Sequence, residues 1–318
     1  KKLRGERGTK VTITYLRNAA TKQAVITRDA IPLVSVDASY MMTKEIGYIR
    51  LNKFSSVTYR EFMEALEPLK KAGLQKLILD LRGNGGGILD QAVEIADEFL
   101  DGDKLITYTE GKHVDKKEYR CRRNGQFETG KLVVLADEGS ASASEILIGA
   151  LQDWDRATIV GRRSFGKGLV QEQFDLSDKS ALRLTIARYY TPIGRSIQRP
   201  YTNGERAYYD EVSNRYHDPE TTYADSVKNN SGKAYKTKGG KTVYAKGGIA
   251  PDYFIAMDTS GFSKNSAAIY NKSTISSFAY NFYLQNQALI KTFKSPADFI
   301  KGFSLSDENW KQFTDAAA

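Results

Sequence analysis

The hydrophobic pattern of the chain begins as strand-like alternation and becomes a mixture of strand and helix periods near residue 46. Residues 10–17 alternate between polar and apolar side chains and predict a strand, and a second short strand is expected over 23–28. Two strands cannot bury a face by themselves. This first segment is therefore predicted to be a fragment or part of something larger.

From residue 46 onward, short apolar runs alternate with segments whose apolar residues recur every three or four positions. Within 58–72, for example, Phe62 and Leu66 fall on one helical face. The predicted order is strand 47–51, helix 58–72, strand 76–81, helix 88–100, strand 131–135, a helix ending near 153 and strand 157–160. Such alternation favours an α/β fold with a mostly parallel, layered sheet.

The pattern changes again in the last third of the chain. Segments 171–174 and 181–190 are expected to be adjacent strands. Residues 201–246 are rich in Tyr, Asn, Lys and Gly with little periodicity, which predicts an insertion or long loop. The chain is thus divided into a first β segment (1–28), an α/β core (29–200), the insertion (201–246), a return to the core (247–263) and a helical segment (264–318).

Composition excludes several classes of function. The 318 residues are 41% hydrophobic and 27% charged, as in ordinary soluble proteins that bury a sizeable core. The formal charge of +9 would suit a nucleic acid, but the basic residues are dispersed and no nucleic-acid-binding motif is present. Cys121, the single cysteine, is expected to be a packed or surface thiol, and His113 and His217 to be surface residues. No metal-ligand cluster is found, and no stretch reaches the ~18 apolar residues of a membrane helix.

Candidate chemistry lies in a serine run at 139–146 and in the glycine-flanked Lys167. Ser142 and Lys167 are 25 positions apart, which suits a helix leaving the serine and a strand returning toward it. A serine hydroxyl becomes a good nucleophile when a base takes its proton, and lysine can be that base once burial or a positive dipole lowers its pKa. The pair predicts a serine–lysine hydrolase. Ser140 and Ser144 compete with Ser142, since spacing does not decide among them.

Both candidate residues also have non-catalytic interpretations. Ser142-Ala-Ser-Glu145 fits a capping box, in which the serine and the glutamate satisfy N–H groups at a helix start. Taken alone, that segment favours capping over catalysis. Residues 161–168 nearly match the phosphate-binding loop G-x-x-x-x-G-K-[ST]. Gly168 stands where the loop requires a hydroxyl, and a strand rather than a helix is predicted to follow, which disfavours an ATPase.

The glycine-rich turn at 83–87 follows a predicted buried strand. Glycines there would let backbone N–H groups approach a ligand closely. The N–H of Gly83, together with that of Ala143, could form an oxyanion hole. A tight turn that requires positive φ explains the same glycines equally well. A dinucleotide-binding match fails, because Ile88 stands at the last glycine position.

Taken together, the motifs resemble the carboxyl-terminal processing proteases, also called tail-specific proteases. The resemblance covers roughly residues 1–260, with the motifs in the family's order. The motifs are Asp80-Leu-Arg-Gly-Asn-Gly-Gly-Gly87, Gly139-Ser-Ala-Ser-Ala-Ser-Glu145, Gln152-Asp-Trp-Asp-Arg-Ala157, Phe165-Gly-Lys-Gly168 and Tyr189-Tyr-Thr-Pro-Ile-Gly-Arg-Ser-Ile197. Residues 3–12 resemble the last part of the PDZ domain that such proteases carry, so 1–28 is expected to be a remnant of that domain, most of which is missing.

The resemblance implies a core of the ClpP/crotonase type and a serine endopeptidase that cleaves proteins near their C-termini, without metal or cofactor. By motif position, Ser142 is the nucleophile, Lys167 the general base and Gln171 the residue that orients the lysine. The oxyanion donors are expected at Gly83 and Ala143. Because Lys167 and Gln171 are four positions apart, both are expected on one side of a strand.

The resemblance further implies substrates with extended C-terminal tails and a periplasmic or otherwise exported protein, associated with the membrane through a missing N-terminal region. A homo-oligomer assembled through the C-terminal segment and an adaptor protein are open alternatives for its partners. A catalytically silent or latent peptide-binding scaffold of the same fold is the competing function. A third candidate, an acyl-CoA enzyme of related topology, would need a CoA pocket, of which the sequence shows no sign.

Overall fold

The computed structural model describes residues 2–17, 19–30, 34–201, 204–215, 232–245, 247–257, 269 and 272–317. The chain divides into two compact units, Lys1–Ala256 and Met257–Ala318. Among the helices in these ranges, none is long and apolar enough to cross a membrane.

A mostly parallel sheet forms the centre of the first unit. Its six described strands are, in sheet order, β14 (Tyr253–Phe254), β9 (Thr158–Gly161), β8 (Lys131–Ala136), β5 (Lys76–Asp80), β4 (Ile46–Leu51) and β3 (Val36–Met41). Only β3 runs antiparallel to its neighbour within this set. The predicted α/β sheet is confirmed. The prediction omits β3, although Val36-Asp-Ala-Ser-Tyr alternates between apolar and polar side chains as a strand does.

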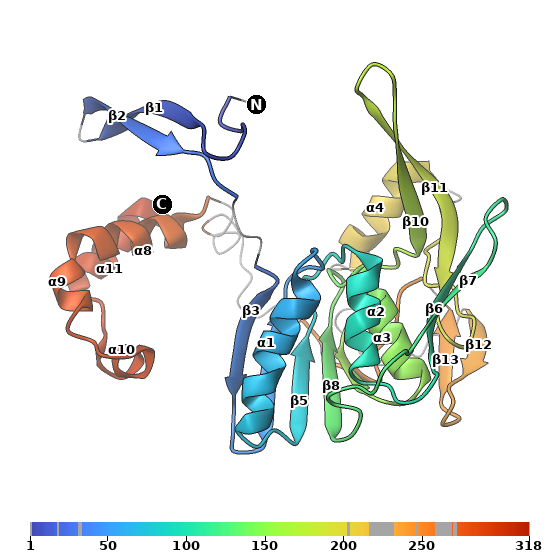
Figure 1. The fold of residues 1–318 in the computed structure, drawn as a ribbon. Helices are drawn as coiled ribbons and strands as arrows, with labels where there is room; N and C mark the ends of the chain where they lie inside the picture. Colours follow the sequence, from blue (N-terminus) through green and yellow to red (C-terminus); the bar gives the residue numbers. More distant parts are fainter. Residues whose placement is uncertain are drawn as a thin grey trace. The chain divides into compact units, whose positions relative to one another are not determined.

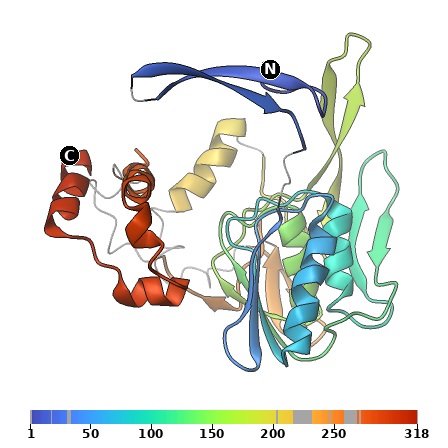
Figure 2. The ribbon, with the colours of Figure 1, turned by 60° about the vertical axis from the view of Figure 1, so that its left-hand side comes forward.

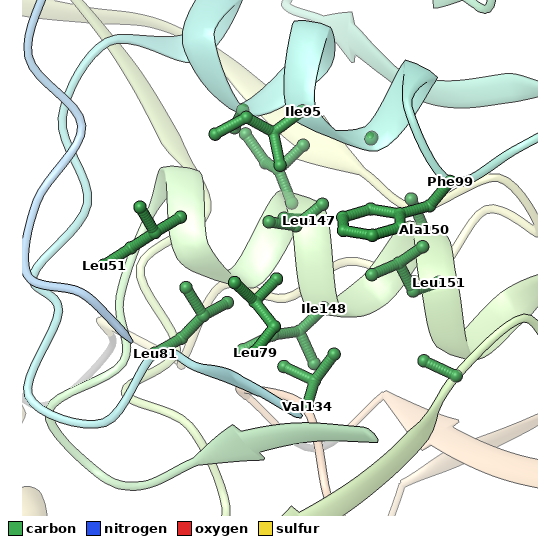
Figure 3. Close-up of a cluster of buried hydrophobic side chains, with 14 of the residues drawn as sticks. Leu51, Leu79, Leu81, Ile95, Phe99, Val134, Leu147, Ile148, Ala150 and Leu151 are labelled. Carbon is green, nitrogen blue, oxygen red and sulfur yellow. The ribbon is translucent and has the colours of Figure 1, made fainter. Parts of the chain in front are cut away.

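Three helices lie together over one face of this sheet (Figure 1). They are α1 (Thr58–Lys71), α2 (Leu89–Asp97) and α3 (Ala143–Asp153). The core lies between helices and sheet, and Figure 3 shows Leu79 and Val134 of the sheet beside Ile148 of α3. Every residue of α3 is buried. Since truncating one buried leucine or isoleucine costs about 2–5 kcal/mol, this packing holds the start of α3 firmly in place.

A second sheet contains β10 (Leu169–Asp175), β11 (Ala181–Tyr190), β6 (Leu105–Glu110) and β7 (Lys117–Arg120), in that order. All of its pairings are antiparallel, and the predicted adjacency of β10 and β11 is confirmed. Only Arg188–Tyr190 of β11 pair with β6. The rest of the β10–β11 hairpin therefore projects beyond the other two strands (Figure 2).

The predicted insertion at 201–246 contains regular structure, so its interpretation as a long loop is wrong for the described part. Helix α4 spans Gly204–Arg215, and β12 (Lys233–Lys236) and β13 (Thr242–Ala245) form a hairpin. Neither has a strong apolar period, because polar contacts and a few buried side chains, such as Tyr208 of α4 and Val243 of β13, hold both in place. In the hairpin turn, the N–H of Gly239 donates to Asp155 at 2.6 Å. Residues 216–231 lie outside the described ranges.

At the beginning of the chain, the two predicted strands are present as β1 (Lys10–Arg17) and β2 (Ala20–Thr27), and β2 begins three residues before the predicted strand. The two strands pair as an antiparallel hairpin. The return of the chain to the sheet after residue 247 is also confirmed, because β14 pairs in parallel with β9.

The second unit is helical, as predicted for the last part of the chain. Its described helices are α8 (Thr274–Gln285), α9 (Gln287–Ile290), α10 (Pro296–Gly302) and α11 (Asp307–Ala317). Aromatic side chains hold it together: Phe278 packs against Phe313 with ring centroids 5.3 Å apart, and Phe299 stacks on Phe303 at 4.4 Å. Such pairs add to the free energy of simple burial.

Candidate active site

Ser142 precedes the first residue of α3 in an unusual backbone conformation. Its φ of 56° and ψ of −115° lie in a region that residues with a side chain rarely adopt. Gly86 packs directly against it, and a Cβ on Gly86 would lie 2.8 Å from the Cβ of Ser142. Strained backbone of this kind persists only where its surroundings enforce it, and it concentrates at functional sites. Here the buried helix and the glycine-rich loop enforce it.

The three serines of the run have different environments. Ser140 and Ser144 are fully buried. The hydroxyl of Ser140 donates to the carbonyl of Leu81 at 2.8 Å, and that of Ser144 donates to the carbonyl of Asn84 at 2.9 Å. Ser142 is partly exposed. Two of the three candidate serines are therefore buried and held in structural hydrogen bonds, and Ser142 is the one that is partly exposed.

Lys167 lies in the loop between β9 and β10, flanked by Gly166 and Gly168, and is partly buried. The expectation that Lys167 and Gln171 share one side of a strand is wrong, because β10 begins only at Leu169. Gln171 is exposed and follows a bulge, where the pairing shifts from Val170–Ala187 to Gln171–Thr185. Within the described residues, no hydrogen bond joins the side chains of Ser142, Lys167 and Gln171.

A buried carboxylate joins the serine and the lysine segments. Glu145 is 0% exposed, and its Oε2 accepts the backbone N–H of Ser142 at 2.9 Å and that of Lys167 at 2.8 Å. Its Oε1 accepts the hydroxyl of Ser164 and the N–H of Gly166, both at 2.6 Å. The serine segment and the lysine loop therefore meet at the side chain of Glu145. From the sequence, this residue was interpreted only as one member of a capping box.

Burial and hydrogen bonding act on Glu145 in opposite directions. Removal from water disfavours the charged form and raises the pKa of this carboxyl above its usual range. The hydrogen bonds from Ser164, Lys167, Ser142 and Gly166 favour the charged form and oppose that rise. A buried carboxylate with so many donors is a structural anchor whose donors would lose their partner if it were replaced.

The glycine-rich loop differs from its predicted role at one residue. The N–H of Gly83 donates to Asp137 Oδ1 at 2.8 Å, so it does not point freely at a substrate oxygen. The N–H of Gly86 is likewise taken by the side chain of Asn84, at 2.9 Å. By contrast, the N–H groups of Gly85 and Ala143 have no hydrogen-bond partner within the described part of the chain. Ala143 is thus available as an oxyanion donor, and Gly83 is not.

The loop is attached to the serine run by further hydrogen bonds. The N–H of Ala141 donates to the carbonyl of Asn84 at 2.9 Å. At the start of the loop, fully buried Asp80 accepts the hydroxyl of Tyr48 and pairs with Arg82, each at 2.6 Å. Burial raises the pKa of Asp80, but the hydrogen bonds from Arg82 and Tyr48 outweigh it and hold this pKa below its ordinary value. Asp80 is therefore an ionised anchor rather than an acid.

The motifs at 152–157 and 189–197 meet away from the serine. Buried Arg195 donates to the side chains of Gln152, at 2.9 Å, and of Asp153. Arg156 donates to the carbonyl of Phe99 at 2.9 Å. Arg195 thus joins the segment that follows β11 to the end of α3, and Arg156 joins the segment after α3 to the end of the α2 segment.

The alternative chemistries find no support in the described residues. A strand follows the loop at 161–168, so the phosphate-binding loop is excluded. His113 is exposed, as predicted, while His217 lies outside the described ranges. Cys121 is buried, and burial raises the pKa of its thiol to about 12, which disfavours the thiolate that a nucleophile needs. No group of three or more His, Cys, Asp or Glu side chains that could hold a metal occurs in those ranges.

Comparison with known proteins gives consistent matches. Residues 45–204, half of the chain, match the model of peptidase family S41. The chain is 41% identical over 202 residues to a carboxy-terminal-processing protease of Bartonella bacilliformis, covering 62% of this chain and 46% of that protein. A carboxyl-terminal-processing protease of Synechocystis is 40% identical over 205 residues, covering 62% and 47%.

Among solved structures, a photosystem II D1 C-terminal processing protease matches with a TM-score of 0.51 and 27% identity. The match covers 79% of this chain and 57% of that one. The chain thus spans less than half the length of the two curated relatives named above.

Proposed function

Because the chain belongs to peptidase family S41, we propose that it is a serine endopeptidase that cleaves proteins near their C-termini, with Ser142 as nucleophile and Lys167 as general base. One observation carries this proposal. The backbone N–H groups of both residues donate to the same carboxylate oxygen of Glu145, at 2.9 and 2.8 Å. The two residues are therefore held at neighbouring positions by a fully buried side chain.

In the proposed reaction, neutral Lys167 takes the hydroxyl proton of Ser142 as its oxygen attacks the peptide carbonyl carbon. The tetrahedral intermediate collapses when the resulting ammonium gives its proton to the leaving amine, and an ester to Ser142 remains. Water then attacks that ester, Lys167 again taking and returning a proton. The products are two shorter chains and the restored hydroxyl. Gln171 is assigned to orient the lysine, which requires its side chain to turn toward Lys167 when substrate binds.

The negative charge on the substrate oxygen requires prepared donors. We assign them to the N–H of Ala143 and that of Gly85. Two facts support this choice: both N–H groups lack partners in the described residues, and the N–H of Gly83 is already bound to Asp137. Ala143 is also the first residue of α3, and the N-terminus of a helix favours negative charge.

The β1–β2 hairpin is assigned to the end of a PDZ domain. Leu16 and Val25 on this hairpin are 75% and 63% exposed, and an isolated hairpin is marginally stable at best. Additional strands covering these side chains would give it a hydrophobic face. We further propose that the substrates are proteins with extended C-terminal tails, and that this protease is itself an exported protein.

Digestion of an unstructured protein such as casein, with mass spectrometry of the products, tests the function. The native chain should produce fragments, and Ser142→Ala should produce none while keeping its circular dichroism spectrum. Ser177→Ala, an exposed serine in the β10–β11 turn, is the matched control and should cleave normally. Equal cleavage by the native chain and Ser142→Ala would contradict the assignment of the nucleophile. Binding of casein by the native chain without cleavage would support the peptide-binding scaffold instead.

A further inference from the structure

A cluster of arginines joins α4 to the loop that carries Lys167, and the proposed reaction does not use it. Arg215, at the end of α4, donates to the carbonyl of Ser164 at 2.8 Å and to that of Phe165 at 3.3 Å. Arg199 lies between two rings, with its guanidinium carbon 4.3 Å from the centroid of Phe165 and 4.0 Å from that of Tyr208. Helix α4 is therefore attached to the lysine loop by both polar and aromatic contacts.

The lysine loop is held from two sides by complementary groups. On one side, Glu145 accepts the N–H groups of Gly166 and Lys167. On the other side, its carbonyl groups are bound: Arg215 binds those of Ser164 and Phe165, and the backbone N–H of Arg199 donates to Gly166 at 3.0 Å. Loss of either set would remove several of the hydrogen bonds that hold the loop.

One carboxylate organises the arginine side. Glu211 of α4 accepts Arg163 at 2.9 Å, Arg199 at 2.5 Å and Arg215 at 2.9 Å. The side chains of Arg199 and Arg215 are only 3% and 4% exposed. Guanidinium groups do not lose their proton in proteins, so these nearly buried positive charges need a counter-ion, and like charges gathered together repel one another.

We infer that Glu211 is a positioning residue for Lys167, acting through the arginines that hold the lysine loop; the inference rests on the proposed function. Replacement of Glu211 by a neutral side chain leaves Arg163, Arg199 and Arg215 without this shared anion. The guanidinium groups then lose this shared anchor, which weakens the hydrogen bonds that Arg215 donates to the carbonyls of Ser164 and Phe165. Lys167 is displaced although no catalytic group has been altered.

Glu211→Gln is the test, because it removes the charge and keeps the shape. Asp210→Asn is the matched control: its carboxylate pairs with Arg206 at 3.7 Å on the exposed side of the same helix. We expect Glu211→Gln to lower kcat about tenfold or more and to change KM less than about twofold, since small displacements of a reacting group cost rate and the cluster contains none of the proposed reacting groups. Asp210→Asn should match the native chain, and Glu211→Asp, which keeps the charge, should recover part of kcat.

Hydrogen exchange of the peptide covering residues 164–170 provides a readout that does not depend on activity. Exchange there should be faster in Glu211→Gln than in Asp210→Asn. Near-UV circular dichroism confirms that each variant is folded. If Glu211→Gln does not fold, the test is the smaller effect expected of Glu211→Asp, whose shorter side chain should give a kcat below that of Asp210→Asn and faster exchange. The inference is overturned if Glu211→Gln equals Asp210→Asn in both kcat and exchange, or if only KM changes. If the native chain cleaves nothing, the proposed function fails, and the exchange comparison alone decides whether Glu211 holds the loop.

Discussion

Ser142 and Lys167 are 25 positions apart in the chain, yet their backbone N–H groups donate to one oxygen of Glu145, at 2.9 and 2.8 Å. The two nitrogens therefore lie no farther apart than the sum of these distances. A buried side chain that contacts both loops relates their positions, so a change at Glu145 should affect the serine and the lysine together.

Glu145→Gln should reduce both activity and stability. An amide keeps one oxygen acceptor, so some of the four donors now bound by the carboxylate would be left buried without a partner. Each buried group left in this way costs about 1–3 kcal/mol. Urea unfolding and casein digestion would measure the two effects. Glu64→Gln, an exposed position on α1 with 68% of its side chain accessible, should change neither.

Lys167→Arg should be inactive although it preserves the positive charge. The proposed base must be neutral, and a guanidinium group stays protonated in proteins. We expect cleavage to fall by about 100-fold to 10,000-fold, the usual contribution of a general base, as measured by initial rates on a labelled protein substrate. Lys71→Arg, at the exposed end of α1, should cleave like the native chain. Appreciable cleavage by Lys167→Arg would assign the base elsewhere.

Gly86→Ala should impair cleavage more than an equivalent change elsewhere. Gly86 has a φ of +88°, and a Cβ there would overlap the carbonyl oxygen of Ala141 and lie 2.8 Å from Ala143 N. Gly240 has a φ of +91° with nothing within 4 Å, so Gly240→Ala reproduces the backbone strain without the collision. Both variants should lose about 1–2 kcal/mol from the left-handed conformation. Digestion rates should fall only for Gly86→Ala, and equal rates would show that the contact with the serine segment is unimportant.

The pH dependence of stability should report the charge of Glu211. Burial raises the pKa of this carboxyl, but hydrogen bonds and charges from the arginines outweigh it and lower its pKa from 4.5 to about 2. Because the folded pKa lies below the unfolded one, the ionised carboxylate stabilises the fold above pH 4.5, and this contribution is lost as the pH falls toward 2. The stability difference between the native chain and Glu211→Gln should therefore shrink over that interval in urea titrations. For Asp210→Asn the difference should stay small throughout.

Asp153→Asn should be strongly destabilising, because it leaves Arg195, which is 1% exposed, without its ion-pair partner. Breaking a buried pair on one side costs about 3–5 kcal/mol. Arg206→Met breaks an exposed pair with Asp210 and should cost less than about 1 kcal/mol. Thermal unfolding of the two variants would compare these costs, and similar melting temperatures would contradict the structural role given to Arg195.

The hydrophobic periodicity of the sequence was sufficient to predict most of the helices and strands of the central sheet and its covering layer. The predicted helix over 58–72 corresponds to α1 at Thr58–Lys71, and the predicted strand over 131–135 corresponds to β8 at Lys131–Ala136. These segments bury one face or both, so their hydrophobic spacing is imposed by the fold itself. Helix α4 lacks this signal, because ion pairs from Glu211 to arginines outside the helix, and the packing of Tyr208 against Phe165, hold it. The hydrophobic pattern within a segment does not predict ion-pair partners that are distant in the sequence.

The motifs in the sequence were enough to identify the peptidase family, a resemblance that the comparisons confirm. The serine and lysine of the proposed reaction can also be found in the sequence, because the reaction requires these residue types and the family's motifs occur in a fixed order. Folding decides which of those groups are free to react. Ser140, Ser144 and the N–H of Gly83 become occupied by hydrogen bonds to residues distant in sequence, while Ser142 is left accessible. Whether a polar group finds a hydrogen-bond partner depends on its neighbours in space, so it is determined only when folding brings the loops together.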